Sequence, residues 1–486
     1  MVEHAAPFAL ELTLEPGAAA KAFRRPAIAS RVRGSGVSLV WYCAADGSLG
    51  EEGLALVVEA RRRGAVQRLV RCRPEAGETW LPGRPMPVLA EAPLPDRQPR
   101  PGLIAALAEH LVPQSLAAFE GRRSVAQAAG VTVTLLAGTL RAVTAERPVA
   151  RLTLEGEREA VFALAASLAA DLPLAIPATT IAEEARALAR GAPPRPLRLG
   201  APAIARGATT EQAFSAIVAH LCLAILANAP AADAGETPEG VHQTRVALRR
   251  LRSALSLFRD VGGAEGERAS AGLKGLAATL GPARDWDVFI TGRLAAVRAA
   301  FPEEERIAAL ARRAEAVREA AYAALRASLD SPGFRLLGLA LAELAAAPGA
   351  APEPVEGFAA RALNKRLKRV LRHGEDLSGL PIAELHRLRL DCKRLRYAGE
   401  MFAPLFGQKK ARRFLKSLAA VQEELGHLND AEVGAVLLEE VGEPGEASAF
   451  ASGVVEGWIA AKADGAREAA FEAWEEFLGR DVFWDG

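Results

Sequence analysis

The chain has 486 residues, half of them hydrophobic, and its 60 Lys and Arg against 59 Asp and Glu leave a formal net charge of +1. This length predicts two or three domains, and this hydrophobic content argues against global disorder. Because the total charge is balanced, any surface for a polyanion has to be local. The four cysteines lack CxxC spacing, which favours a reducing compartment over a disulfide framework or a zinc site.

The first 190 residues alternate short apolar runs with Gly, Pro and Asp, a pattern that is typical of strands joined by turns. Strands are predicted at Phe8–Leu14, Gly36–Trp41, Leu54–Glu59, Val66–Arg71, Val131–Leu136 and Arg151–Leu154. Two helices are expected, at Leu103–Leu111 and Glu157–Ala170. We therefore expect residues 1–190 to form an α+β domain with an antiparallel, barrel-like sheet.

A stretch rich in Pro and Gly at residues 191–204 is the predicted linker. From Thr209 onward the apolar residues take helical spacing, so residues 205–486 are predicted to be all-α, with about eight helices. The apolar stretch Phe214–Ala229 is interrupted by polar residues and is shorter than the roughly 18 residues of a membrane helix. We expect it to be a buried helix, and we expect no membrane partner.

The location of the protein is indicated only indirectly. The N-terminus has no basic segment followed by an apolar core, so no secretion signal is predicted. Together with the cysteine spacing, this favours a cytoplasmic protein. The heavy use of Ala and Arg is typical of a high-GC bacterial genome.

The all-α part contains an internal repeat. Val241–Phe258 reads VHQTRVALRRLRSALSLF, and Leu385–Phe402 reads LHRLRLDCKRLRYAGEMF, which places His242 and His386 144 residues apart. Two further pairs keep this spacing within one residue: Phe214 with Phe358, and LGPARDWDV (Leu280–Val288) with LGHLNDAEV (Leu425–Val433). The repeat predicts a bundle of two pseudo-symmetric four-helix units.

Both copies of the motif carry basic residues at helical spacing. Positions i, i+3 and i+7 share one helix face, so His242, Arg245 and Arg249 form a stripe. Clustered cations repel one another, and a phosphate polyanion relieves that repulsion while accepting two hydrogen bonds from each planar guanidinium. The equivalent basic positions are His242, Arg245, Arg249, Arg250 and Arg252 in the first motif, and His386, Arg389, Lys393, Arg394 and Arg396 in the second.

The helix before the second motif adds charge. Residues 358–397 contain eleven Lys and Arg against four acids, and Lys365 and Arg369 belong to this basic group. Most charge runs are solvated faces that keep a protein soluble, but two copies at equivalent positions favour a binding surface. Within the motifs only Asp391 is available to neutralise these cations. For His242 and His386, a helix-capping or structural hydrogen bond stays open as an alternative.

The LGPARDWDV segment has two interpretations. Asp285, with its equivalent Asp430, could pair with motif arginines or cap the next helix, and we favour this structural role over catalysis. Asp285 and Asp287 together could instead hold a metal ion. The second copy weakens this alternative because Asn429 replaces the arginine beside the acid.

The two motifs and the LGPARDWDV segment resemble the CHAD family, the conserved-histidine α-helical domains, over about residues 205–486. The resemblance implies a bundle of two four-helix repeats, at about residues 209–345 and 353–486. It also implies a basic pore or groove that binds inorganic polyphosphate, as in proteins associated with polyphosphate granules. The ten basic positions of the two motifs would line that pore.

The N-terminal part resembles a CYTH domain, a triphosphate tunnel fold that hydrolyses triphosphate with a divalent metal. Several positions depart from the family pattern: Ala9 and Thr13 around Glu11 in the opening ExExK, Val57 and Glu59 where paired arginines belong, and Arg151 in the last acidic strand. A triphosphatase needs carboxylates for the metal and cations for the phosphates. We therefore expect an inactive domain that serves as a scaffold, as a partner surface, or as a weak phosphate site using Arg61, Arg62 and Arg63.

The sequence thus favours a non-enzymatic polyphosphate-binding protein without a cofactor. We expect it in the cytoplasm, where polyphosphate granules are a candidate location. No P-loop, HExxH, GxSxG or dinucleotide motif is present. The alternatives are an inorganic triphosphatase in the N-terminal domain and unspecific nucleic-acid binding. Nucleic acid is the weaker partner because Tyr397 is the one aromatic residue within the second motif before its packing end, and single-strand binders need stacking platforms.

Overall fold

A computed structural model of the chain describes residues 7–25, 28, 31–75, 78, 80–105, 107, 112–192, 200, 202–347, 351–375, 377–442, 445–463 and 465–485, without the side chains of 378, 382, 428–432, 462 and 463. It divides into two compact units. The sheet unit comprises Met1–Leu197, Cys222–Ala234 and Asp330–Ala346, and the helical unit comprises Arg198–Leu221, Gly235–Leu329 and Ala347–Gly486. The predicted linker at 191–204 lies largely outside the described residues, and the domain boundary there stays a prediction.

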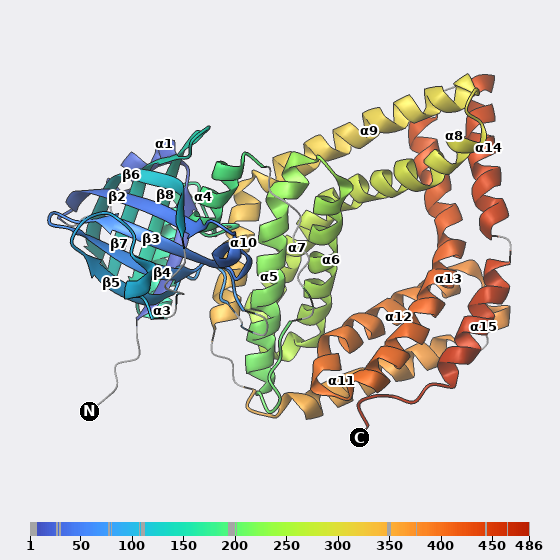
Figure 1. Ribbon diagram of the computed structural model, residues 1–486. Helices are drawn as coiled ribbons and strands as arrows, with labels where there is room; N and C mark the ends of the chain where they lie inside the picture. The colour runs from blue at the N-terminus through green and yellow to red at the C-terminus, as the bar shows by residue number, and fades with distance from the viewer. Residues whose placement is uncertain are drawn as a thin grey trace. The chain divides into compact units, whose positions relative to one another are not determined.

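The sheet unit is built on nine strands in the order β5-β4-β3-β2-β6-β7-β8-β1-β9, all paired antiparallel. They are β1 (Phe8–Leu14), β2 (Arg33–Ala44), β3 (Leu54–Ala60), β4 (Ala65–Arg71), β5 (Val88–Leu94), β6 (Pro113–Ala128), β7 (Val131–Arg141), β8 (Glu146–Gly156) and β9 (Leu174–Ala175). The sheet is strongly curved (Figure 1). Its end strands β5 and β9 do not pair with each other, so the described strands form an open sheet and the expected barrel closure is not confirmed.

All six predicted strands are present, and β1 has the predicted bounds. The longest strand, β6, was missed because its central segment EGRRS is polar and hides the alternation of a strand. Backbone pairing with β2 on one edge and β7 on the other holds it in place. The helix predicted at Leu103–Leu111 is wrong over its described residues, since a short 3-10 turn at Pro101–Leu103 ends in extended backbone at Ile104.

Among the described residues up to 192, four helices accompany the sheet: α1 (Pro16–Ala22), α2 (Ser48–Glu51), α3 (Arg158–Asp171) and α4 (Ile181–Arg190). Helix α3 confirms the one predicted at Glu157–Ala170. Helix α4 begins after Thr180, whose side chain accepts a hydrogen bond from the Glu183 backbone N–H at 3.4 Å. The apolar side of α4 packs against buried residues of β2, β6 and β8 and covers this face of the sheet.

The predicted all-α part contains eleven described α-helices, so the expected number of eight was too low. They are α5 (Thr210–Ala234), α6 (Pro238–Leu257), α7 (Arg259–Val288), α8 (Ala295–Ala300), α9 (Glu305–Leu329), α10 (Pro332–Ala346), α11 (Val355–His373), α12 (Ile382–Phe402), α13 (Gln408–Val441), α14 (Glu446–Ala463) and α15 (Ala466–Leu478). A π-helical turn at Phe289–Leu294 separates α7 from α8. The sequence pattern did not show this break because apolar spacing continues through it.

Helix α5 is longer than the predicted apolar stretch. It has 25 residues, and by length and composition it could cross a membrane, which corrects the prediction that the stretch is too short. Within the structure 67% of its most apolar window is buried, as the buried-helix prediction requires. The polar Asn228 is satisfied inside the helix, where its side-chain amide donates to the Ala224 carbonyl at 2.8 Å.

An aromatic cluster fixes α6 against α12 in the helical unit. Phe258 at the end of α6 stacks on Phe358 of α11, with ring centroids 4.6 Å apart, and contacts Phe402 at the end of α12 at 5.9 Å. Phe214 of α5 completes the group at 5.4 Å from Phe258. Each such pair is worth about 0.5–1.5 kcal/mol beyond its buried area. The four rings are the equivalent positions of the sequence repeat, and they bring the two basic motifs together.

Candidate anion-binding site

The two motif helices bury one side and keep a basic side. In α6 the buried residues include Val241, Leu248 and Leu251, at the spacing of an amphipathic helix. Thr244 lies on the buried side, where its hydroxyl donates to the Gly240 carbonyl at 2.8 Å. The cations between these positions are half-buried rather than fully solvated, so their charges interact through a less polar medium than water.

Five predicted cations from both motifs form one group, which we name the paired-helix cluster: Arg245 and Arg249 of α6, and Arg389, Lys393 and Arg396 of α12. Lys393 is at the centre of this group. Burial first, and then repulsion from the four arginines, lowers the pKa of Lys393 to about 8. Two motifs 144 residues apart in the sequence therefore act electrostatically on one ammonium group.

Tyr397 anchors two of these arginines. Its ring is 9% exposed, and the Arg249 and Arg396 guanidinium carbons each lie 5.8 Å from the ring centroid. Burial, followed by repulsion from Arg245 and Arg396, lowers the pKa of Arg249. The Nε of Arg249 is buried without a hydrogen-bond partner among the described residues. The cluster thus holds a guanidinium whose donors are not all used.

Two carboxylates border the cluster. Asp285 of α7 lies 3.4 Å from Arg245, which confirms the predicted ion pair with a motif arginine. The capping alternative for Asp285 is wrong because the residue lies within α7. Glu400, which the sequence analysis missed, lies 2.7 Å from Arg250 and 3.3 Å from Arg396. It is one helical turn beyond Arg396, and that i, i+4 spacing is the signal that could have revealed it.

A glycine lies beside an arginine in each motif. A Cβ atom on Gly281 of α7 would lie 3.2 Å from a terminal nitrogen of Arg245. In the second motif, a Cβ atom on Gly426 of α13 would lie 3.5 Å from a terminal nitrogen of Arg389. These are the glycines of LGPARDWDV and LGHLNDAEV, so the equivalent glycine lies beside the equivalent arginine in both repeats.

Other predicted residues lie elsewhere. Arg369 and Arg394 pair with Asp391, not with the paired-helix cluster. Asp391, the acid within the motifs, thus neutralises Arg394 of the second motif and Arg369 of α11. Arg252 and Lys365 are exposed, and no described ion pair or ring contact ties them to the cluster. His242 and His386 are half-buried one turn before Arg245 and Arg389.

The acid two residues after Asp285 has a structural role. Asp287 is fully buried and accepts hydrogen bonds from Arg318 Nε at 2.8 Å and from the Tyr322 hydroxyl at 2.9 Å. Burial, reinforced by the Asp287 carboxylate, raises the pKa of Tyr322. Asp287 therefore ties α7 to α9. Its equivalent Glu432, with Asn429 and Asp430, lies outside the described side chains.

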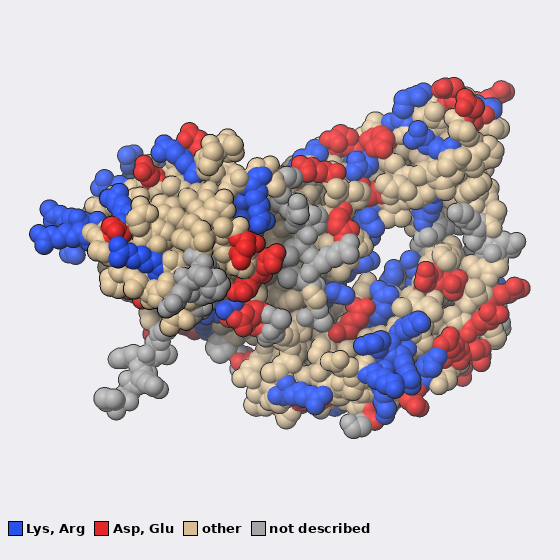
Figure 2. All heavy atoms as spheres, in the orientation of Figure 1, with Lys and Arg blue, Asp and Glu red and all other residues tan. Residues whose placement is uncertain are grey.

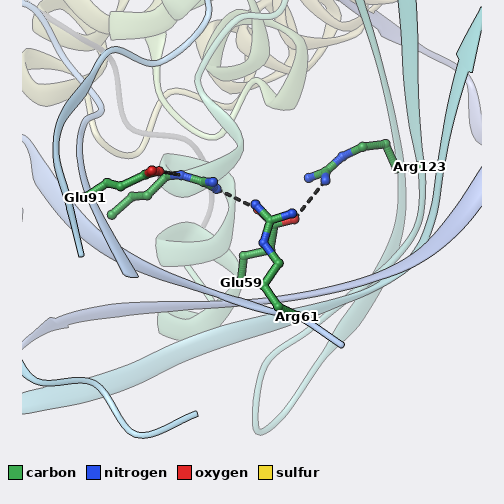
Figure 3. Close-up of polar contacts among 5 residues, drawn as sticks. Glu59, Arg61, Glu91 and Arg123 are labelled. Atoms are coloured by element: carbon green, nitrogen blue, oxygen red, sulfur yellow. Dashed lines mark hydrogen bonds and ion pairs between the residues drawn. The ribbon is translucent and has the colours of Figure 1, made fainter. Parts of the chain in front are cut away.

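In the sheet unit, a buried carboxylate holds three arginines (Figure 3). Glu59 of β3 is 4% exposed at its side chain and lies 2.6 Å from Arg68, 2.8 Å from Arg123 and 3.3 Å from Arg61. Burial alone would raise the pKa of Glu59, but the hydrogen bonds from Arg123 and Arg68 outweigh it and lower the pKa. Arg68 also reaches Glu91 at 2.7 Å. The network is therefore largely compensated from within.

An open pocket of about 680 Å³ lies beside this network and has a basic lining. Arg61 and Arg62, two of the three residues predicted as a weak phosphate site, line it together with Arg97 and Arg141. Arg141 is paired with Glu146 at 3.0 Å and faces Glu120 at 3.6 Å.

Glu11, the one acid left from the ExExK pattern, also interacts with an arginine. Burial raises the pKa of Glu11, with Arg151 opposing and Glu184 reinforcing the shift. Arg151 Nε lies 3.6 Å from Glu11, and Arg151 also pairs with Glu184 of α4. The described residues hold no group of three or more His, Cys, Asp or Glu that could bind a metal ion.

Comparison with known proteins places the helical part in a family. Residues 216–439 match the family model of the CHAD domain. The chain contains a CHAD domain. The crystal structure of the CHAD domain from the plant Ricinus communis is 29% identical, with a TM-score of 0.50, covering 60% of this chain and 97% of that chain. The search of curated proteins gave no match.

Two further solved structures are more distant. PptA from Streptomyces chartreusis is 18% identical with a TM-score of 0.46, covering 55% of this chain and 100% of that one. A Hippeastrum protein described as an adenylyl cyclase with a dominant triphosphatase activity is 15% identical with a TM-score of 0.27, covering 35% of this chain and 89% of that one. The paired-helix cluster lies within the CHAD domain, since Arg245 to Arg396 fall inside the matched residues.

Proposed function

We propose that the CHAD domain binds inorganic polyphosphate without catalysis, through the paired-helix cluster. The observation that carries the proposal is the convergence of four arginines from α6 and α12 on the partly buried Lys393; burial first, and then repulsion from these arginines, lowers the pKa of that ammonium group to about 8. Only Asp285 and Glu400 border the cluster among the described carboxylates. An external polyanion would add negative charge beside these five cations.

Polyphosphate suits this arrangement for two physical reasons. It carries about one negative charge on each internal phosphate, so one chain can engage several cations spaced along two helices. Its binding also releases counterions, which favours association at moderate salt, as for nucleic-acid backbones. Figure 2 shows Lys and Arg along the rim of an opening in the helical unit and gathered over α11 and α12.

We further infer that the CHAD domain consists of two related helical repeats, at about residues 209–345 and 353–486, each with more than the four helices that the sequence predicted. The four equivalent phenylalanines meet in one cluster, and Gly281 under Arg245 corresponds to Gly426 under Arg389. These correspondences support a basic pore or groove shared by the repeats. A cytoplasmic protein at the surface of polyphosphate granules is the setting that this proposal implies.

The two other functions are less well supported. For nucleic acid, Tyr397 would have to offer a face to a base, but it is 9% exposed and is already covered by two guanidinium groups. For a triphosphatase in the sheet unit, Glu11 would have to face a metal, but it is partly buried and lies 3.6 Å from Arg151. Phosphate release from tripolyphosphate with Mg²⁺ or Mn²⁺ above background would restore the enzymatic alternative.

The test is a titration of the full chain with long-chain polyphosphate at about 150 mM salt, beside single- and double-stranded DNA of equal charge. We expect tight binding to polyphosphate alone. Arg245→Gln/Arg389→Gln should weaken it about 100-fold, because each substitution removes charged hydrogen bonds worth about 1.5–3 kcal/mol. The slope of log affinity against log salt should also become shallower.

A matched control is Arg268→Gln/Arg361→Gln, which removes two exposed arginines of α7 and α11 that pair with local acids. This variant should bind as the wild type does. Equal binding of all three polyanions, or equal loss in both variants, would replace the proposal by an unspecific basic surface.

A further inference from the structure

Three arginines converge on one buried carboxylate where α11 packs against α12. Asp391 is 3% exposed, and it accepts hydrogen bonds from Arg394 at 2.7 Å and from Arg369 at 3.0 Å, each on a different oxygen. Arg366 is the third, half-buried and close enough to act on Asp391 electrostatically. We name these four residues the α11–α12 cluster. Three positive charges against one negative charge leave a net charge of +2.

Keeping this excess positive charge partly buried costs free energy. Burial first, and then repulsion from Arg394, lowers the pKa of Arg366 to about 10, with Asp391 opposing the shift. Arg366 forms no ion pair with a carboxylate in the part of the chain that the structure describes. His373 Nδ1 also lies 2.7 Å from Asp391, without hydrogen-bond geometry. An anion bound here would therefore stabilise a group that the fold itself leaves short of negative charge.

The geometry favours a compact anion. Arg369 and Arg394 each use one nitrogen on Asp391, which fixes two guanidinium forks from two helices around one point. Their side chains are 58% and 52% exposed, so the remaining N–H groups are accessible from outside. The paired-helix cluster instead spreads its cations over several turns of two helices. The α11–α12 cluster therefore suits a single phosphate group, and the paired-helix cluster suits an extended chain.

We propose that the α11–α12 cluster is a second oxyanion site, which binds one doubly charged phosphate group. Two sources share this chemistry, free orthophosphate and the end of a polyphosphate chain, because an end phosphate has a second ionisation near pH 6 that an internal phosphate lacks. The chain-end version rests on the proposed polyphosphate function. The orthophosphate version is independent of it.

The experiment measures binding of three probes to the full chain at pH 7.5: orthophosphate, linear tripolyphosphate, and cyclic trimetaphosphate, which has no chain end. The variant is Arg366→Gln/Arg369→Gln, and the control is Arg361→Gln on the same helix. We expect the variant to weaken tripolyphosphate about tenfold and to leave cyclic trimetaphosphate unchanged. Thermal unfolding of both variants shows whether the fold is retained.

Each outcome has one meaning. Weaker tripolyphosphate with unchanged orthophosphate assigns the site to chain ends, and weakening of both assigns it to any free phosphate group. No change in either, or equal weakening of all three probes, overturns the proposal and leaves a structural ion-pair network. Long-chain binding separates the two proposals, because Arg245→Gln/Arg389→Gln should weaken it about 100-fold while Arg366→Gln/Arg369→Gln should reduce it only slightly.

Discussion

The arginines around Glu59 and the cations of the paired-helix cluster differ in how their charge is balanced. In the sheet unit a carboxylate that is almost fully buried receives three guanidinium groups, and Arg68 reaches a second acid. In the CHAD domain five cations act on one another around Lys393, and the acids lie at the border. The number of arginines is thus a poor guide to an anion site. What separates the two regions is how far acids of the protein balance the cations: Glu59 and Glu91 lie among the three arginines of the sheet unit, whereas Asp285 and Glu400 lie at the border of the paired-helix cluster.

The largest effect that separates the regions concerns stability. Glu59→Gln should lower the free energy of unfolding by about 2 kcal/mol, because it leaves three partly buried guanidinium groups without their shared partner. The folded-state pKa of Glu59 is lowered, so its contribution is present at neutral pH and is lost as the pH falls through the acidic range. Denaturant unfolding at pH 7 and pH 3.5 measures both statements.

Glu91→Gln is the control for this prediction, because the more exposed Glu91 contacts only Arg68 of the network and should cost less than about 0.5 kcal/mol. A stability loss of equal size in both variants would show that burial of the central acid is not what matters.

The next effect is the pH dependence of binding in the CHAD domain. Lys393 has a pKa of about 8 without ligand, and a bound polyanion should raise it again, so binding takes up a proton above pH 8. We expect polyphosphate affinity to fall about tenfold between pH 8 and pH 9.5 in the wild type and to stay nearly level in Lys393→Met. Titration calorimetry in buffers of different ionisation enthalpy measures the proton uptake directly. If the polyphosphate affinity of Lys393→Met fell with pH as it does in the wild type, the titrating group would not be Lys393.

The smallest expected effect is a gain in polyphosphate affinity rather than a loss. Glu400→Gln should tighten polyphosphate binding about threefold, since it removes a border carboxylate and releases donors of Arg250 and Arg396. We do not expect removal of an acid in the sheet unit to strengthen polyphosphate binding. Weaker binding in Glu400→Gln would mean that this acid positions the two arginines for the ligand instead of competing with it.

The sequence predicted which motif positions come together in space, and their role in binding stays a prediction. The 144-residue repeat and helical periodicity together selected Arg245 with Arg389 and Arg249 with Lys393, and the structure brings these residues into one cluster. Periodicity succeeds here because equivalent positions on two similar helices face the same neighbours when the helices pack around shared core residues.

The rest depends on tertiary packing. Arg394 follows Lys393 directly, so it is rotated by about 100° and faces α11 instead of α6. Which neighbour covers each face of α12 is not encoded in the spacing of its own residues. The same limit applies to β6, whose polar centre is held by pairing on both edges rather than by apolar alternation.

Helix α5 is divided between the two units, and this affects how the chain can be truncated. Thr210–Leu221 belongs to the helical unit, while Cys222–Ala234 and the whole of α10 belong to the sheet unit. Within the sheet unit, Gly338 of α10 lies against Leu226 and Ile176. Expression of residues 205–486 alone would retain α10 and the end of α5 without the sheet residues that cover them, and such a fragment should tend to aggregate.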